Sequence, residues 1–139
     1  MRIILCIVFL LSANYVFAQD TGGATKQKAD TAEKIFTIVE VMPRFPGDEV
    51  ELFRYLLKNV KYPKAARKNK IEGKVILTFV VDKNGTVRDV RVIQSVSPEL
   101  DEEALRVIKL MPQWTPGTQN DRPVSVYFTI PIKFALPKN

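Results

Sequence analysis

The stretch Val-Ser-Val-Tyr-Phe-Thr-Ile-Pro-Ile-Lys-Phe, residues 124–134, decides the fold. Its apolar side chains stand at every second position: Val124, Val126, Phe128, Ile130, Ile132 and Phe134. Strict alternation is typical of a β-strand that packs one face on a hydrophobic core and leaves the other face in water. Pro131 has no N–H group to donate to a neighbouring strand, so we expect this strand at the edge of a sheet. Such an edge must be covered, or it can capture an extended peptide.

Three helical segments are predicted upstream of this strand. Asp48 is a good N-cap for a helix over residues 49–59, in which apolar residues keep helical spacing. A short basic helix is predicted over residues 63–69, because its first residue is a proline, which suits a first helical turn. Ser97 is the N-cap of a third helix over residues 98–111, which has acidic residues in its early turns and an apolar stripe.

A β-hairpin is the strongest local prediction. Residues 74–81 and 86–94 alternate in the manner of strands, and residues 82–85, Asp-Lys-Asn-Gly, form the turn between them. In the return strand, alternation places Val87 and Val90 on opposite faces.

The element order helix, helix, strand, strand, helix, strand predicts an α+β fold, with a three-stranded antiparallel sheet and two to three helices packed on one face. Residues 113–122 are expected to form a loop, in which Trp114 packs against the preceding helix rather than binding a ligand. Residues 35–44 are a β-prone arm that joins the sheet, covers its edge or hangs free. The domain itself is expected over residues 45–139.

The N-terminus predicts export. Arg2, the apolar run at residues 3–11 and the small-residue site that ends at Ala18 are typical of a secretory signal peptide, residues 1–18. The alternative is an uncleaved membrane anchor, which we favour less because the apolar segment is shorter than the roughly 20 residues of a spanning helix. Residues 19–34 have no apolar period and predict a short disordered tether.

The residue inventory leaves little room for an enzyme. The sequence has no histidine, and its one cysteine, Cys6, lies in the predicted leader. Metal, histidine and thiol chemistry therefore lack their usual side chains in the exported chain, and no glycine-rich phosphate loop is present. We expect no enzymatic activity and no cofactor.

Basic residues gather between the first two predicted helices: Lys58, Lys61, Lys64, Arg67, Lys68 and Lys70. Nucleic acid is not the expected partner, because only Tyr62 interleaves with the cluster and an exported protein rarely meets nucleic acid. We favour a solvated helix face, with an acidic peptide partner as the second interpretation.

A series of short motifs occurs in order along the chain: Tyr62-Pro63, Ala65-Ala66, Ile71-Glu72-Gly73-Lys74-Val75, Phe79-Val80-Val81-Asp82, Asn84-Gly85, Leu100-Asp101, Ala104-Leu105, Met111-Pro112, Trp114, Pro116-Gly117 and Ile130-Pro131-Ile132. Each motif is weak alone, but this order and spacing resemble the TonB C-terminal domain family over about residues 45–136. The Pro46-Gly47 lead-in and the segment 110–117 look like the Bacteroidetes-type energy transducers of that family.

The resemblance implies a role in energy-dependent transport across the outer membrane. Proteins of this family connect the inner-membrane partners ExbB and ExbD to outer-membrane TonB-dependent transporters. Their C-terminal domain lies in the periplasm and captures a short extended segment of the transporter, the TonB box, as an added strand beside its last strand. That mode, β-augmentation, agrees with the edge strand expected from the residues.

Strand parity indicates where a peptide would dock. Ser125, Tyr127 and Thr129 turn their backbone groups to the same edge as Pro131, where the pairing would stop. The candidate peptide-binding residues of the strand are Ser125, Val126, Tyr127, Phe128 and Thr129. The resemblance adds Asn59, because the family also uses residues just before its Tyr-Pro.

Two functions remain open. The first is a TonB-type energy transducer that binds transporter peptides and contacts ExbB and ExbD through a retained, membrane-anchored N-terminus. The second is a free periplasmic adaptor or competitor module without force transmission, which a cleaved leader and a short tether favour. An open edge also allows strand exchange between two copies, giving a homodimer.

Overall fold

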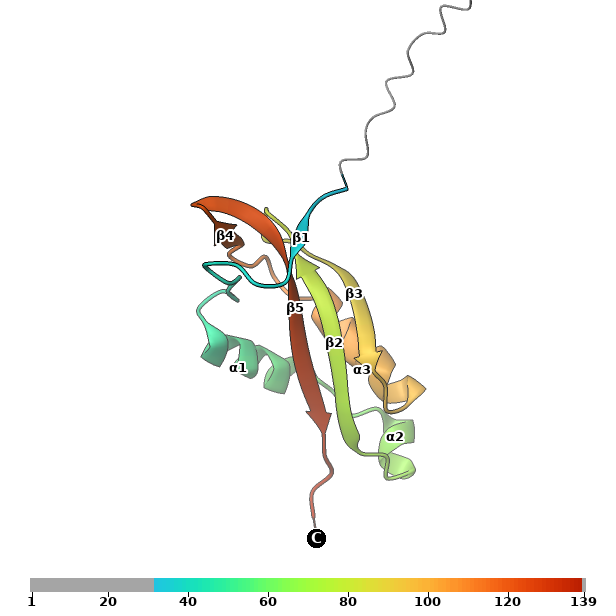
Figure 1. Cartoon of the computed structure of the whole chain (residues 1–139). Coiled ribbons are helices and arrows are strands. Elements are labelled where there is room, and N and C mark those ends of the chain that lie inside the picture. Colours follow the sequence, from blue (N-terminus) through green and yellow to red (C-terminus); the bar gives the residue numbers. More distant parts are fainter. Residues whose placement is uncertain (1–31, 139) are drawn as a thin grey trace, which may run out of the picture. The chain divides into compact units, whose positions relative to one another are not determined.

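A mixed β-sheet with the strand order β1-β5-β2-β3 is the centre of the structure (Figure 1). Strands β2 (Gly73–Val81), β3 (Val87–Gln94) and β5 (Arg122–Phe134) are antiparallel neighbours, which confirms the predicted three-stranded sheet. Strand β1 (Ile35–Phe36) pairs with β5 in parallel, so the N-terminal arm joins the sheet at its edge.

The computed structural model describes residues 32–138. The predicted signal peptide and residues 19–31 of the predicted tether lie outside these described residues. All named elements belong to one unit, Lys34–Asn139. Within the described part of the chain, no helix is long and apolar enough to cross a membrane.

Strand β2 lies between β3 and β5 and supplies the middle of the hydrophobic core. Four of its side chains are completely buried on the core face: Val75, Leu77, Phe79 and Val81. The predicted alternation of β5 is confirmed, since Ile130, Ile132 and Phe134 are at most 5% exposed. The register places Leu77 opposite Ile130, so the core faces of the two strands coincide.

Three helices pack on this face of the sheet: α1 (Glu49–Asn59), α2 (Lys64–Lys68) and α3 (Pro98–Lys109) (Figure 1). Their buried apolar residues belong to the same core cluster as β2: Leu52, Ala66, Leu100, Ala104 and Ile108. The α+β architecture expected from the element order is therefore present.

The starts of the two longer helices follow from their N-caps. The Asp48 carboxylate accepts hydrogen bonds from the N–H groups of Val50, at 2.8 Å, and Glu51, at 3.3 Å. The Ser97 hydroxyl oxygen accepts one from the N–H of Leu100 at 3.3 Å. Each cap satisfies backbone donors that a helix cannot pair internally, so the predicted helix starts are confirmed.

The expectation of a plain loop over residues 113–122 was wrong. Strand β4 (Gly117–Gln119) lies in this segment and pairs with residues 122–124 at the start of β5. Asn120 and Asp121 connect the two strands with φ angles of 50° and 60°. Asn and Asp tolerate this left-handed conformation, which two-residue hairpin turns require, so the dipeptide closes a tight turn.

Strand β3 differs from its predicted alternation. Val87 and Val90 both pack against the core cluster instead of facing opposite ways. The register shifts between them at Asp89, whose φ is 53°. This β-bulge adds one residue to β3 and returns Val87 to the core face.

Candidate functional site

The outer edge of β5 is only partly covered. Strand β1 pairs with β5 at Ser125 and Val126, and β4 pairs with the three residues before them. Along residues 127–134, β2 is the only described strand that pairs with β5. Phe36 lies opposite Val126 in a parallel pair and so bonds the residues on either side of Val126, which include the Tyr127 N–H. The backbone on the side away from β2 is therefore open from the Tyr127 carbonyl onward.

Pro131 indicates which backbone groups point to that open side. It lies opposite Ile76 in the β2–β5 ladder and has no N–H group to donate. Antiparallel ladders alternate between pairs that exchange hydrogen bonds and pairs that turn their N–H and C=O groups outward. Thr129 and Tyr127 lie two and four residues before Pro131, so they share its orientation and turn both groups to the outer edge.

The candidate peptide-binding residues of β5 lie in two parts of the strand, one covered by the arm and one uncovered. Ser125 and Val126 lie under the chain's own arm, paired with Ile35 and Phe36, and Ser125 is only 2% exposed. Tyr127, Phe128 and Thr129 follow on the uncovered part of the strand. The free edge is therefore shorter than predicted at its N-terminal end.

Asn59 lies apart from this edge, at the C-terminal end of α1. Its side-chain N–H donates to the backbone oxygen of Tyr55 at 2.7 Å, and its own backbone oxygen accepts from Arg106 at 2.9 Å. Asn59 does not line the groove beside the edge. Its contacts connect the end of α1 to α3, and a role of Asn59 in peptide binding stays a prediction.

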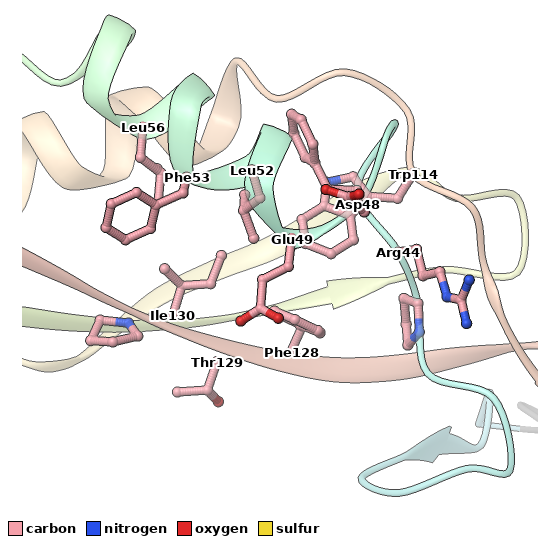
Figure 2. A pocket seen from close by; sticks show the side chains of 13 residues that line it. Arg44, Asp48, Glu49, Leu52, Phe53, Leu56, Trp114, Phe128, Thr129 and Ile130 are labelled. Atoms are coloured by element: carbon pink, nitrogen blue, oxygen red, sulfur yellow. The ribbon is translucent and has the colours of Figure 1, made fainter.

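A groove of about 610 Å³ runs between α1 and the open part of β5 (Figure 2). Its lining comes from the segment before α1, from α1 itself, from Trp114 and from β5: Pro43, Arg44, Phe45, Asp48, Glu49, Leu52, Phe53, Leu56, Trp114, Phe128, Thr129, Ile130 and Pro131. The groove is therefore bordered on one side by the backbone edge that lacks a partner strand.

Aromatic side chains close the groove at one end. Trp114 is 3% exposed and packs edge-on against Phe45, at 5.6 Å between ring centroids, and against Phe128, at 5.0 Å. Trp114 thus packs in the core, as predicted, but its aromatic partners come from β2, from β5 and from the segment before α1 rather than from the preceding helix: Phe79, Phe128 and Phe45. Its indole N–H is buried and has no hydrogen-bond partner among the described residues.

Helix α1 forms the other wall, and sequence reasoning did not foresee it. Leu52 is buried in the core, whereas Phe53 is 65% exposed beside the groove. Figure 2 shows Leu52, Phe53 and Leu56 extending from α1 on the side of β5, with Ile130 across from them. The only sequence signal is the width of the apolar stripe on residues 49–59, which exceeds what one sheet contact can bury.

A polar clasp holds the C-terminal end of α1 against α3. Arg106 donates two hydrogen bonds to the Glu103 carboxylate, at 2.7 and 2.8 Å, and that carboxylate also accepts from the N–H of Lys61 at 2.7 Å. The hydrogen bonds from Arg106 hold the pKa of the Glu103 carboxyl below its ordinary value of 4.5. The Tyr55 hydroxyl donates a hydrogen bond to the backbone oxygen of Val107 at 2.9 Å. Burial raises the pKa of the Tyr55 hydroxyl.

The groove has features that suit the binding of an extended chain. Within residues 32–138, no group of histidine, cysteine, aspartate or glutamate side chains is arranged to hold a metal ion. The groove offers an unpaired strand edge, an apolar wall and three charged side chains at one end: Arg44, Asp48 and Glu49. Extended peptide backbone is the ligand that such an edge accepts.

Comparison with known proteins identifies the family. Residues 58–136 match the family model described as Gram-negative bacterial TonB protein C-terminal. Protein TonB of Helicobacter pylori, in strains 26695 and J99, is 31% identical over 80 residues, which is 57% of this chain and 27% of each relative. The chain thus spans about a quarter of the length of these curated relatives.

A solved structure shares the fold. The NMR solution structure of the Helicobacter pylori TonB C-terminal domain is 25% identical and superposes with a TM-score of 0.50, covering 65% of this chain and 81% of that one. The family match spans more than half of the chain and includes α2, α3 and all of β2 to β5. This protein therefore belongs to the TonB C-terminal domain family.

Proposed function

We propose that this protein acts in transport across the outer membrane by binding an extended peptide, the TonB box, of TonB-dependent transporters. The peptide adds as a strand to the outer edge of β5, at Tyr127, Phe128 and Thr129. The observation that supports this function best is the unpaired edge of β5 beside the groove. Membership in the TonB C-terminal domain family supports the choice of partner.

Two features limit the length of the added strand. At one end, β1 covers Ser125 and Val126, so a peptide that reaches them has to displace the arm. At the other end, Pro131 offers a carbonyl oxygen but no N–H group. Between these limits, Tyr127 presents its carbonyl and Thr129 presents both backbone groups, which suits a short peptide whose affinity comes from main-chain hydrogen bonds.

The location that accompanies this function is the periplasm, reached through the predicted signal peptide. Contact with ExbB and ExbD, and thus force transmission, requires a retained N-terminal anchor. The predicted cleavage after Ala18 favours the second function, a free periplasmic adaptor or competitor. N-terminal sequencing of the exported protein after membrane fractionation distinguishes the energy transducer from the free module. A soluble chain that starts at Gln19 excludes direct energy transduction. A full-length membrane-bound chain excludes the free module.

Backbone pairing is tested with Thr129→Pro and its matched control Thr129→Val. The probe is a synthetic peptide copied from the TonB box of a transporter of the same organism, called here the transporter peptide. Thr129→Pro removes the N–H group from the free edge and should lower affinity at least about tenfold. Thr129→Val keeps the N–H group and should bind as the wild type does. Equal affinity for all three proteins would exclude pairing at this edge.

A further inference from the structure

Helix α1 presents apolar surface that the fold itself does not cover. Phe53 is 65% exposed and lines the groove, and Leu56 lies on the same wall. In Figure 2, both side chains lie on the α1 side of the groove at the end where Ile130 of β5 lies, whereas the Glu49 carboxylate lies next to Phe128. The wall is thus apolar over Ile130 and charged over Phe128.

A strand added to β5 would bring its side chains under this wall. It would lie about 4.8 Å from β5, and its residues opposite Phe128 and Ile130 would point to the same face of the sheet as those two side chains, toward α1. Glu49 and Phe53 are one helical turn apart on α1, so they lie on the same side of the helix and can face two different positions of such a strand.

We propose that α1 is the specificity determinant of the groove, and that it selects an extended peptide with a bulky apolar residue opposite Ile130. Phe53 and Leu56 cover that residue from the α1 side. Two residues away, opposite Phe128, the peptide carries a polar or basic residue that meets the Glu49 carboxylate. This inference rests on the proposed function, because it assigns side-chain selection to the peptide that β5 binds.

Two observations favour such a peptide as the occupant. The apolar wall is continuous with the unpaired edge of β5, so an occupant that covers Phe53 can also pair with Thr129. The Glu49 carboxylate forms no ion pair or hydrogen bond within residues 32–138, and it extends from α1 toward β5, where a basic residue would complement it (Figure 2).

The test compares two acetylated, fluorescent peptides on wild-type protein and two variants. The first peptide is Thr-Lys-Thr-Leu-Thr-Ser, and the second has serine in place of leucine. The variant Phe53→Ser removes the wall. Leu57→Ser is the matched control, because Leu57 is an exposed apolar residue of the same helix, 72% exposed, that does not line the groove. Circular dichroism verifies that both variants remain folded.

The leucine peptide should bind wild-type protein about tenfold more tightly than the serine peptide, the typical effect of covering one such side chain. Phe53→Ser should reduce this ratio to about one, and Leu57→Ser should preserve it. A ratio of one on wild-type protein, or an equal effect of both variants, overturns the selection by α1.

The controls separate this inference from the proposed function. If the transporter peptide binds and is sensitive to Thr129→Pro while the leucine preference is missing, the selection by α1 is wrong and the proposed function stands. If neither the transporter peptide nor the leucine peptide binds, both fail. A dimer in analytical ultracentrifugation that Phe53→Ser dissolves would mean that a second copy fills the groove, and this would also overturn the inference.

Discussion

Pro131 of β5 lies directly opposite Ile76 of β2. A proline at this position costs the sheet no hydrogen bond, because the pair belongs to the class that turns its backbone groups away from the partner strand. Thr129 and Tyr127 belong to the same class, so the groups that β2 does not need all face the outer edge. One proline thus indicates which half of the strand's backbone is available to another chain.

A proline at Ile130, the residue after Thr129, should destabilise the fold, whereas a proline at Thr129 should not. Ile130 lies opposite Leu77 and turns its backbone groups toward β2. Ile130→Pro should remove a ladder hydrogen bond and core packing, and it should destabilise the fold by about 3 kcal/mol or more. Urea unfolding measures the difference from Thr129→Pro, which should remain close to wild type. Similar losses for the two variants would contradict the assigned parity.

The arm should compete with longer peptides. Replacing both Ile35 and Phe36 by proline removes the donors with which β1 pairs along Ser125 and Val126. An eight-residue transporter peptide should then gain affinity, because the outward backbone groups of Ser125 and the N–H of Tyr127 become available, whereas a five-residue peptide that pairs only around Thr129 should bind as before. Isothermal titration calorimetry with both lengths checks this. If only the five-residue peptide gained affinity, the arm would not compete for the edge at Ser125 and Val126.

Gly85, the last residue of the turn between β2 and β3, contacts the backbone of Trp114, which lines the groove. Its φ is +84°, and a Cβ at this position would lie 1.9 Å from the backbone oxygen of Trp114. Gly85→Ala should therefore displace the Trp114 segment and destabilise the protein by roughly 1–3 kcal/mol. Trp114 is the only tryptophan, so its emission should shift to longer wavelength as the indole meets water. Lys83→Ala, on the exposed side of the same turn, should change neither stability nor emission.

The clasp between α1 and α3 should make the free energy of unfolding depend on pH. The folded-state pKa of Glu103 lies below its ordinary value of 4.5, so its contribution is fully present above pH 4.5 and is lost as pH falls through the folded-state pKa. Glu103→Gln should lower the free energy of unfolding at pH 7 and flatten its decline below pH 4.5. Glu102→Gln on the exposed face of α3 is the control, and urea unfolding at several pH values measures both. Parallel pH profiles of wild type and Glu103→Gln would exclude the clasp.

Local signals in the sequence predicted the secondary structure well where they were strong. Asp48 and Ser97 are polar caps before apolar periods, and the helices begin where these caps predict. The alternation of β5 likewise predicted its core face, because period-two burial depends only on strand geometry. The hairpin of β2 and β3 was found through its Asp-Lys-Asn-Gly turn.

Features that depend on contacts distant in the sequence were not predictable. The bulge at Asp89 and the Asn120-Asp121 turn use left-handed residues without glycine, and Asn and Asp, which also occur at helix caps and in loops, are a weaker signal for such positions. The pairing of β1 with β5 joins segments about ninety residues apart, and the arm alone is compatible with several placements. The groove depends on where α1 lies relative to the edge of β5, which helix periodicity alone does not determine.

Amide hydrogen exchange of β5, measured by NMR with and without saturating transporter peptide, tests the central claim most directly. In the free protein, β2 should protect the amides of Phe128 and Ile130 and β1 should protect that of Tyr127, whereas the amide of Thr129 should exchange rapidly. With peptide bound, the amide of Thr129 should become protected as a new strand pairs with it. Peptide binding that leaves the Thr129 amide in rapid exchange would contradict strand addition at this edge.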